Sequence, residues 1–275
     1  MAKISIITIN FNDKIGLDKT INSIVNQTYT DFEFLVIDGG STDGSTAVIE
    51  QNASKINYWI SEKDNGVYNA QNKGIKAATG EFVIFMNSGD AFVDNHVLSN
   101  VSDDLTNDFD IYYGDNYKVK ADGSKRLKTY PEKLSFSFFY GSCINHQSTF
   151  IRRKLFDKFF YYSEDLIIVS DWEFFIYAIC KENVPYKYLA KTIANYDFTG
   201  ISSLDKYKSK VNEERLHVMQ KYFPAFVNDY VQVSQLNSKR VQQVLHIQKY
   251  PIAWKFLKSF ISIVLVFIPK FKLNK

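Results

Sequence analysis

The stretch Phe82-Val83-Ile84-Phe85-Met86-Asn87-Ser88-Gly89-Asp90 decides the fold of this chain. Five consecutive apolar residues predict a strand that is buried on both faces. The small polar residues after it predict a turn that carries one carboxylate. A rigid strand that ends in an acid is well suited to place a metal ligand or a charge beside a substrate. Many surface turns also contain Gly and Asp, so the segment gains its meaning from similar segments upstream.

Three earlier apolar segments also end in short polar side chains. They predict strands over residues 4–9, 34–37 and 58–60. Apolar residues at helical spacing between them predict helices over residues 17–25, 44–52 and 67–77. Strand and helix therefore alternate with short connections, which predicts right-handed βαβ units and a mainly parallel, Rossmann-like α/β sheet flanked by helices.

The polar residues that follow these strands are expected to share one edge of the sheet. Ligands of parallel α/β sheets bind beyond the carboxyl ends of the strands. The residues at those ends are Asn10, Asp38, Asp64 and the turn 87–90. Their convergence carries more weight than any single motif.

Beyond Asn95 the regular alternation breaks. Residues 111–120 and 126–130 predict a hairpin around a turn at 121–124. Later segments predict strands over 148–152 and 186–193, a helix that starts at Ser170 or Asp171, and helices over 203–221 and 225–248. The sequence shows no internal repeat.

Composition places the chain among folded proteins of ordinary type. It has 275 residues, of which 45% are apolar and 23% charged, enough to bury a full core. Its two cysteines have no metal-type spacing, so a reducing, cytoplasmic setting is expected. Residues 1–4 run directly into a strand without the apolar region of a signal peptide.

Charge is distributed unevenly along the chain. After Asp229 there are eight Lys and Arg residues and no acid, so the preceding part has a net charge of −5, although the whole chain carries +3. A nucleic-acid-binding protein would spread positive charge over its folded surface. The pattern favours a mildly acidic body with a membrane-facing basic end.

Four motifs in order resemble family 2 glycosyltransferases with a GT-A fold. They are Ile37-Asp38-Gly39-Gly40-Ser41-Thr42-Asp43-Gly44, Asn69-Ala70-Gln71-Asn72-Lys73-Gly74-Ile75, Ala78-Thr79-Gly80-Glu81 and the turn 87–90. His146-Gln147 and Ser170-Asp171-Trp172-Glu173 extend the likeness to bacterial polysaccharide enzymes. The resemblance covers about residues 3–203. It implies a nucleotide-diphospho-sugar donor, a divalent metal and transfer with inversion.

The resemblance also implies roles for the residues at the strand ends. Asp38 would accept from the N3–H of uracil or from a ribose hydroxyl, although it could instead form an Asx turn before Gly44. Thr8 and Asn10 would line the base pocket, and Asn is equally common in turns. Asp64 would hold the ribose and Lys73 the diphosphate. A plain surface turn and a solvated lysine are the respective alternatives.

Asn87, Ser88 and Asp90 would complete the donor site, with Asp90 as the ligand of Mn²⁺ or Mg²⁺. The family pattern has two or three Asp residues around this turn, whereas Asn87 and Gly89 stand here. A single carboxylate implies weaker metal binding, so His146 is the candidate for a further ligand. A hydrogen-bonded core histidine and a metal-independent site stay open as alternatives.

Asp171 is the candidate catalytic base, which would take the proton of the acceptor hydroxyl as that oxygen attacks the anomeric carbon. Such a base contributes roughly 10²–10⁴-fold to the rate. The segment Ser170–Glu173 also fits a capping box, with Ser170 at the N-cap. The two interpretations are compatible, because the positive end of a helix dipole favours an ionised carboxylate.

The C-terminal segment 252–268 is almost wholly apolar. Its four polar residues lie at i, i+3, i+4 and i+7, on one stripe of a helix: Lys255, Lys258, Ser259 and Ser262. The uninterrupted apolar run is shorter than the ~20 residues of a membrane span. The pattern favours a helix in the plane of the membrane, with packing on the domain or a second subunit as the alternative.

These observations predict two domains. Residues 1–203 would form the GT-A domain, with a nucleotide-sugar half at about 1–95 and an acceptor half at about 96–203. Residues 204–275 would form a helical extension with a membrane-associating tail at 250–275. The turn at Thr199–Ser202 could close over the diphosphate.

The predicted protein is a metal-dependent hexosyl- or N-acetylhexosaminyl-transferase on the inner face of the cell membrane. It would move a sugar, expected to be UDP-linked, to a lipid-linked oligosaccharide of a capsule, exopolysaccharide or O-antigen. The alternative is a nucleotide-binding or scaffold subunit with weakened catalysis, which the thinned acidic turn keeps open. A glycoside hydrolase is less favoured, because no second carboxylate pairs with Asp171. The sequence leaves the oligomeric state undetermined.

Overall fold

The computed structural model describes residues 3–200, 205–227, 229, 236 and 238–269. The chain divides into two compact units, Met1–Val218 and Met219–Lys275. Each unit is described separately below.

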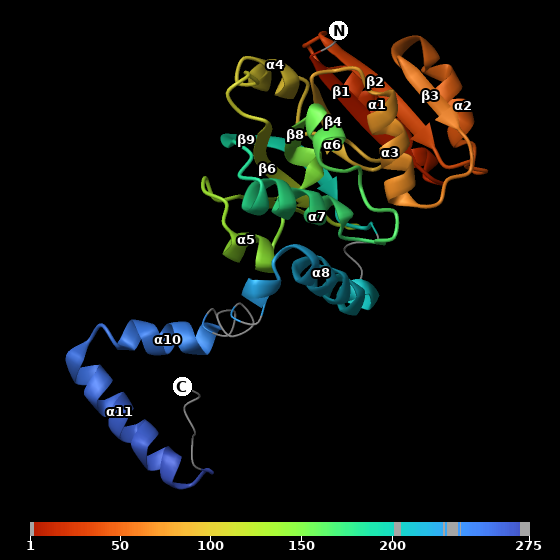
Figure 1. Cartoon of the computed structure of the whole chain (residues 1–275). Helices are drawn as coiled ribbons and strands as arrows, with labels where there is room; N and C mark the ends of the chain where they lie inside the picture. The colour runs from red at the N-terminus through yellow and green to blue at the C-terminus, as the bar shows by residue number, and fades with distance from the viewer. Residues whose placement is uncertain (1–2, 201–204, 228, 230–235, 237, 270–275) are drawn as a thin grey trace. The chain divides into compact units, whose positions relative to one another are not determined.

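The first unit begins with four parallel strands that alternate with helices, as the sequence predicts (Figure 1). The elements are β1 (Ile4–Asn10), α1 (Lys14–Val25), β2 (Phe32–Asp38), α2 (Ser45–Gln51), β3 (Tyr58–Ser61), α3 (Val67–Ala77) and β4 (Phe82–Phe85). β1 lies between β2 and β4, and its last residue, Asn10, pairs in register with Asp38 at the end of β2. The polar residues at these strand ends therefore lie at one edge of the sheet.

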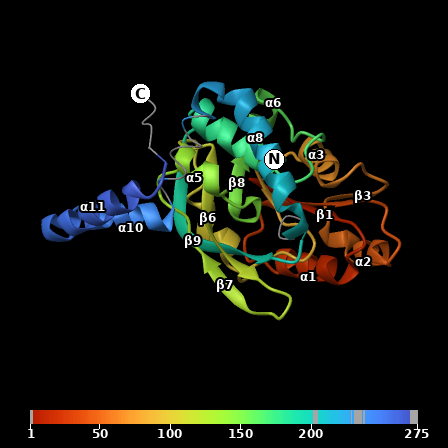
Figure 2. The ribbon, with the colours of Figure 1, turned by 90° about the horizontal axis from the view of Figure 1, so that it is seen from below.

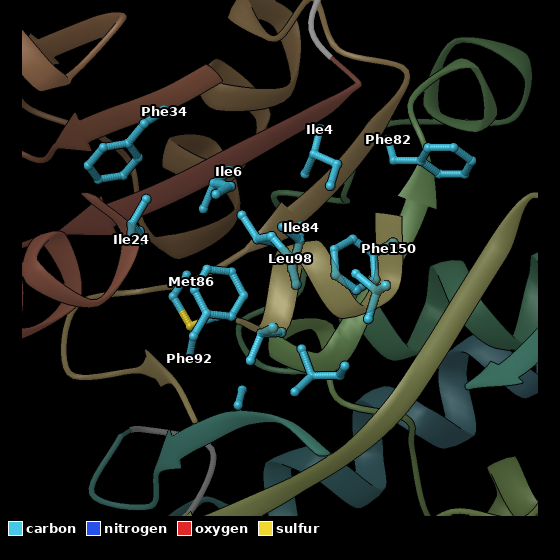
Figure 3. Packing of buried hydrophobic residues seen from close by; sticks show 14 of the residues in the cluster. Ile4, Ile6, Ile24, Phe34, Phe82, Ile84, Met86, Phe92, Leu98 and Phe150 are labelled. Carbon is cyan, nitrogen blue, oxygen red and sulfur yellow. The ribbon is translucent and has the colours of Figure 1, made fainter. Parts of the chain in front are cut away.

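Successive side chains of a strand point to opposite sides. Both faces of these strands are apolar, so each face is covered by helices. α1 and α2 cover one face and α3 the other (Figure 2). Ile24 of α1 packs in one buried cluster with Ile4, Ile6 and Phe34 (Figure 3). On the opposite face a Cβ at Gly74 of α3 would collide with the side chain of Ile7, so the glycine permits close packing of α3.

The second half of this unit adds the elements from β5 to β9, and α8 begins in it. They are β5 (Ala91–Phe92), α4 (Val97–Ser102), β6 (Ile111–Val119), β7 (Lys125–Lys128), α5 (Phe136–Gly141), β8 (Thr149–Arg152), α6 (Lys154–Lys158), α7 (Ser170–Ile176), β9 (Tyr186–Asp197) and α8 (Lys208–Tyr222). The strand order within the described residues is β3-β2-β1-β4-β8-β6-β9-β5, with β7 paired to β6. β8 runs antiparallel to both β4 and β6, so the complete sheet is mixed.

The structure corrects several boundaries. The predicted hairpin is present as β6 and β7, and α7 continues into a π-helical turn at Tyr177–Lys181. The short elements β5, α4, α5 and α6 were not predicted, because two to six residues carry too little periodicity. The start of the predicted helix 203–221 lies partly outside the described residues, as do residues 201–202 of the predicted closing turn.

In the second unit the predicted single helix 225–248 is not continuous. Ser238 has an extended backbone, and its hydroxyl accepts from the backbone N–H of Val241 to cap α10 (Lys239–Ile247). Part of the predicted helix lies outside the described residues. α11 (Pro251–Val266) forms the predicted helix of the apolar tail, whereas Lys270, Lys272 and Lys275 fall outside the described residues. No described helix is both long and apolar enough to span a membrane.

Candidate active site

Three adjacent strand ends are joined by a chain of side-chain hydrogen bonds. The hydroxyl of Ser88, after β4, donates to Oδ1 of Asn10, at the end of β1, over 2.8 Å. The amide of Asn10 donates to Oδ1 of Asp38, at the end of β2, over 2.7 Å. The structure thus brings together three of the residues that the sequence assigns to the donor site.

Asp38 is fully buried and accepts hydrogen bonds from several groups. Besides Asn10, its donors are the N–H and hydroxyl of Ser41 at 2.9 and 2.6 Å and the hydroxyl of Ser61 at 2.6 Å. Burial alone would raise the pKa of this carboxyl, but these hydrogen bonds outweigh it and hold the pKa below its ordinary value. Asp38 therefore fixes the loop after β2, and its predicted contact with a nucleotide stays a prediction.

The remaining predicted donor residues occupy distinct environments. Thr8 is buried and donates to the backbone oxygen of Met86 over 2.7 Å, which ties β1 to the end of β4. Lys73 pairs with Glu62 at 2.7 Å. Their contacts with a nucleotide-sugar stay predictions.

Asp64 reaches toward the backbone of Gly39. A Cβ at Gly39 would lie 2.5 Å from Oδ2 of Asp64. The carboxylate of Asp64 therefore fills the space beside Gly39, so the loop after β3 supplies a second acid next to Asp38.

Asp90 lies in the turn after β4 and is 3% exposed. Its Oδ1 accepts from the backbone N–H of Asp197 over 2.8 Å. The pKa of Asp90 is raised to about 7, mainly by burial and also by the carboxylate of Asp197, while the hydrogen bond from the Asp197 N–H, His146 and a hydrogen bond from Gln147 oppose the shift. Gly89 takes a positive φ of 91°, and a Cβ there would lie 2.7 Å from Oδ2 of Asp197. The turn thus brings two carboxylates together.

His146 connects the turn after β4 to the predicted base. Its Nδ1 lies 3.0 Å from Oδ2 of Asp171, and its Nε2 lies 3.2 Å from Nδ2 of Asn87. A neutral ring that accepts at Nε2 from the Asn87 amide carries its proton on Nδ1 and donates it to Asp171. The ring therefore orients the Asp171 carboxylate.

Asp171 lies in the first turn of α7, and its Oδ1 accepts from two further donors. These are the N–H of Trp172 at 2.9 Å and the hydroxyl of Tyr68, on α3, at 3.3 Å. The predicted capping box is wrong: Val169 is the N-cap, and the hydroxyl of Ser170 accepts from Ser163. The position of Asp171 is thus set by long-range contacts.

The sequence did not predict that Tyr68 would contact Asp171, or that Gln147 and Asp197 would contact Asp90. Tyr68 also accepts from the N–H of Ser170 over 3.0 Å, and burial together with Asp171 raises the pKa of its phenol. Gln147 and Asp197 contact Asp90. The pair His146-Gln147 was a usable signal for Gln147, whereas nothing local in the sequence marks Tyr68 or Asp197.

The residues around Asp90 fit a divalent cation that is held mainly by its substrate. The described part of the chain contains no cluster of three or more His, Cys, Asp or Glu side chains that could hold a metal ion. Mg²⁺ is commonly held by only one or two carboxylates together with substrate phosphates. A buried carboxyl with a raised pKa beside a second carboxylate fits that arrangement, because a cation would relieve both the burial and the repulsion.

The fold and this site define a class. A solved structure of Staphylococcus aureus TarS in complex with UDP-GlcNAc matches 86% of this chain and 67% of its own with a TM-score of 0.63 and 22% identity. The mannosyltransferase PcManGT from Pyrobaculum calidifontis, in complex with GDP-Man and Mn²⁺, matches 96% of this chain and 80% of its own with a TM-score of 0.61 and 13% identity. The fold is that of GT-A glycosyltransferases.

Sequence comparison then gives the family. Residues 5–160 match the model described as glycosyl transferase family 2, and the chain belongs to this family. An uncharacterized glycosyltransferase of Mycobacterium tuberculosis is 32% identical over 73% of this chain and 77% of its own. A PGL/p-HBAD biosynthesis glycosyltransferase of Mycobacterium bovis is 29% identical over 72% of this chain and 78% of its own.

A third relative, from Escherichia coli, is the UDP-Glc:alpha-D-GlcNAc-diphosphoundecaprenol beta-1,3-glucosyltransferase WfgD. It is 30% identical over 51% of this chain and 56% of its own length. The predicted family and fold class are therefore confirmed.

Proposed function

We propose that this protein is an inverting hexosyl- or N-acetylhexosaminyl-transferase. It moves a sugar from a nucleotide-diphospho-sugar to a lipid-linked oligosaccharide in the synthesis of a cell-surface polysaccharide. The observation that carries the proposal is the position of His146 between Asn87 of the donor turn and Asp171 of α7. This contact supports the proposal, because it links the candidate base Asp171 to the turn after β4, at the edge of the sheet where ligands of parallel α/β sheets bind.

The donor side of the proposal rests on the strand ends. Asn10, Asp38, Asp64 and Ser88 would surround the nucleoside. The proposed donor is a UDP-sugar and the proposed acceptor is a lipid diphosphate. Both follow the Escherichia coli relative WfgD, which is named for a UDP-Glc donor and a diphosphoundecaprenol acceptor. Mn²⁺ or Mg²⁺ would be held by Asp90, with Asp197 and His146 nearby, and would neutralise charge on the leaving diphosphate.

Transfer would follow a single displacement. A carboxylate oxygen of Asp171 takes the proton of an acceptor hydroxyl, whose oxygen attacks the anomeric carbon of the donor sugar. The bond between that carbon and the diphosphate oxygen breaks, and the nucleoside diphosphate leaves with the electron pair. Attack from the face opposite the leaving group inverts the anomeric carbon. Tyr68 and His146 keep the carboxylate in position through the contacts described above.

Donor binding provides the test of this proposal. We expect one class among UDP-, GDP-, dTDP- and CMP-sugars to raise the melting temperature of the protein, with a larger shift when Mn²⁺ is present. Because Asp90 would supply the carboxylate to the cation, Asp90→Asn should remove most of the Mn²⁺-dependent increase. Thermal shift measurements with each nucleotide, with and without Mn²⁺, provide the readout, and the exposed Asp18→Asn serves as control.

Each other outcome has a defined meaning. A shift that ignores Mn²⁺ would keep the transferase and remove the metal from its mechanism. Binding of a donor without hydrolysis or transfer under any condition would favour a scaffold subunit. No shift with any nucleotide, from protein that is folded, would contradict the proposal.

Membrane attachment is proposed for the tail. α11 exposes large apolar side chains that include Ile252, Phe256 and Phe260, at 76%, 74% and 63%. Lys255 and Lys258 lie on the same helix, and the segment after Asp229 has no acid to offset its basic residues. An apolar helix with interspersed lysines suits the headgroup region of an anionic leaflet, which would place the enzyme on the cytoplasmic face.

Vesicle binding provides the test of this attachment. Full-length protein should sediment with vesicles that contain an anionic lipid, and the double variant Phe256→Glu/Phe260→Glu should lose most of this binding, because each substitution replaces an exposed apolar side chain that would enter the bilayer with a charged one. A pair of substitutions on the first unit, Ile15→Glu and Ile167→Glu, is a matched control, since both side chains are exposed there. Equal sedimentation of both double variants would argue against attachment through α11.

A further inference from the structure

Four basic side chains gather in the second half of the first unit without acidic partners. Lys118 lies on β6, Arg126 and Lys128 on β7, and Arg215 on α8. Within the described residues, none of the four belongs to an ion pair with a carboxylate. Lys118 and Arg126 are directly opposite in the β6–β7 register, where like charges destabilise a hairpin. This phosphoryl cluster, defined by the four residues, therefore carries unbalanced positive charge.

Lys128 is the centre of the phosphoryl cluster. Its ammonium donates to the backbone oxygen of Cys143 over 3.0 Å and to Oδ1 of Asn145 over 3.2 Å, and it lies 4.6 Å from the centre of the Tyr130 ring. The pKa of Lys128 is lowered to about 8, mainly by burial and also by the charges of Lys118 and Arg215, whereas Cys143 and Asp171 act in the opposite direction. Both hydrogen-bond acceptors are neutral, so these contacts leave one N–H of the protonated ammonium for an anion and do not offset its charge.

Arg215 adds a planar donor group to the phosphoryl cluster from α8, whereas the other three residues lie on β6 and β7. Its guanidinium carbon lies 5.0 Å from the centre of the Trp172 ring, and Trp172 directly follows Asp171. Its Nε is buried and has no hydrogen-bond partner among the residues that the structure describes. An unpaired buried N–H is costly, and a guanidinium fork matches the geometry of a phosphate. The orphan donor therefore indicates an anionic ligand at this position.

The phosphoryl cluster lies beside the predicted base but on different elements from the donor site. Asn145, which holds Lys128, directly precedes His146, and Trp172, which stacks on Arg215, directly follows Asp171. The donor residues lie instead at the ends of β1, β2 and β4. A lipid-linked glycan whose hydroxyl contacts Asp171 carries a diphosphate of its own, separate from that of the donor. The phosphoryl cluster is the basic site near Asp171 that could receive it.

We propose that Lys118, Arg126, Lys128 and Arg215 bind the diphosphate of the lipid-linked acceptor while its sugar hydroxyl lies against Asp171. The inference rests on the proposed function for the identity of the acceptor. The shared chemistry of the ligand is a phosphoryl anion, and the donor diphosphate is the other possible source. The mildly acidic charge of the chain before the basic tail argues against a nucleic-acid backbone as the ligand.

The experiment uses farnesyl diphosphate as a short prenyl diphosphate and full-length protein. We expect the wild type to bind farnesyl diphosphate at least about tenfold more tightly than farnesol, measured by titration calorimetry. The double variant Lys128→Met/Arg215→Met should lose at least about tenfold in affinity for farnesyl diphosphate, the effect expected from removing charged hydrogen bonds. Its affinity for the donor nucleotide with Mn²⁺ should stay within about twofold of the wild type.

Two further variants make the result interpretable. Lys120→Met/Lys125→Met removes the same charge from exposed positions of the same hairpin and should leave the affinity for farnesyl diphosphate unchanged. Lys128→Arg/Arg215→Lys keeps the charge and should recover part of the affinity, which separates an anion site from a purely structural role. Melting temperatures of all variants identify any that fail to fold. If the double Met variant fails to fold, the affinity of Lys128→Arg/Arg215→Lys for farnesyl diphosphate decides whether these residues form an anion site.

Several outcomes would overturn the proposal. Equal affinity for farnesyl diphosphate and farnesol would show that the diphosphate is not recognised. Loss of nucleotide affinity without loss of farnesyl diphosphate affinity would assign the cluster to the donor diphosphate. Equal losses in the Lys120→Met/Lys125→Met control would indicate nonspecific charge attraction. If the wild type binds farnesyl diphosphate through the cluster but no nucleotide, the anion site stands and the proposed transferase fails.

Discussion

Asp171→Asn is expected to reduce the rate of sugar transfer by about 10²–10⁴-fold while donor binding stays nearly unchanged. The amide keeps the shape of the side chain, and its oxygen can still accept from the N–H of Trp172 and the hydroxyl of Tyr68. It cannot take a proton from the acceptor hydroxyl, because an amide oxygen is a very weak base. The loss should therefore fall on kcat and spare the donor Kd.

Initial rates of transfer at saturating donor, together with donor titrations, measure the two quantities separately. Asp165→Asn is the matched control, because Asp165 is an exposed acid six residues before Asp171 in the same segment. It should leave both quantities unchanged. A rate for Asp171→Asn within threefold of the wild type would remove Asp171 as the base and make His146, the imidazole bonded to it, the next residue to test.

Asp38→Ala is expected to lower the free energy of unfolding of the first unit by about 2–4 kcal/mol, the range for losing a buried charged acceptor that serves several donors. Asn10, Ser41 and Ser61 would all lose their shared partner. Urea denaturation of a Trp254→Phe background provides the measurement, since the fluorescence then reports Trp59 and Trp172 of the first unit. Asp18→Ala, at an exposed position of α1, is the control.

The effect of Asp38→Ala should depend on pH in a defined direction. The pKa of Asp38 is lowered in the folded protein from its ordinary value of 3.8, so the folded state binds protons less readily than the unfolded chain. The stabilisation by Asp38 is therefore complete above about pH 4 and disappears as the pH falls below that value. The difference between wild type and variant should narrow in acid. A constant difference from pH 7 to pH 3 would contradict the hydrogen-bond account of its stabilisation.

The first half of the fold could be predicted from local patterns alone. Strands β1 to β4 are mainly apolar segments that end in polar turns, and α1 and α3 show helical spacing, so each element is determined by residues near in sequence. The helix of the tail, α11, was predictable for the same reason. Elements such as α4 and α6 could not be, since five or six residues form a helix only where tertiary packing supports it.

The predicted donor residues were found by their position rather than by any special local chemistry. Asn10, Asp38 and Asp90 follow buried strands, and the rule for parallel sheets places such residues at one edge. The sequence could not tell that Asp38 would have four internal hydrogen bonds, because two of the donors, Asn10 and Ser61, lie on other strands, 28 and 23 residues away. It also could not show that the carboxylate of Asp197 would come beside Asp90.

The sequence by itself determined the family, the alternation of the first four strands with helices and the residues at the strand ends, because these depend on periods of two and 3.6 residues and on short motifs. Only the tertiary structure decided the surroundings of Asp171. Asn87 and His146 are 59 residues apart, and Tyr68 and Asp171 are 103 apart. Contacts over such distances depend on the antiparallel insertion of β8 beside β4 and on the packing of α3 and α7, which no local pattern specifies.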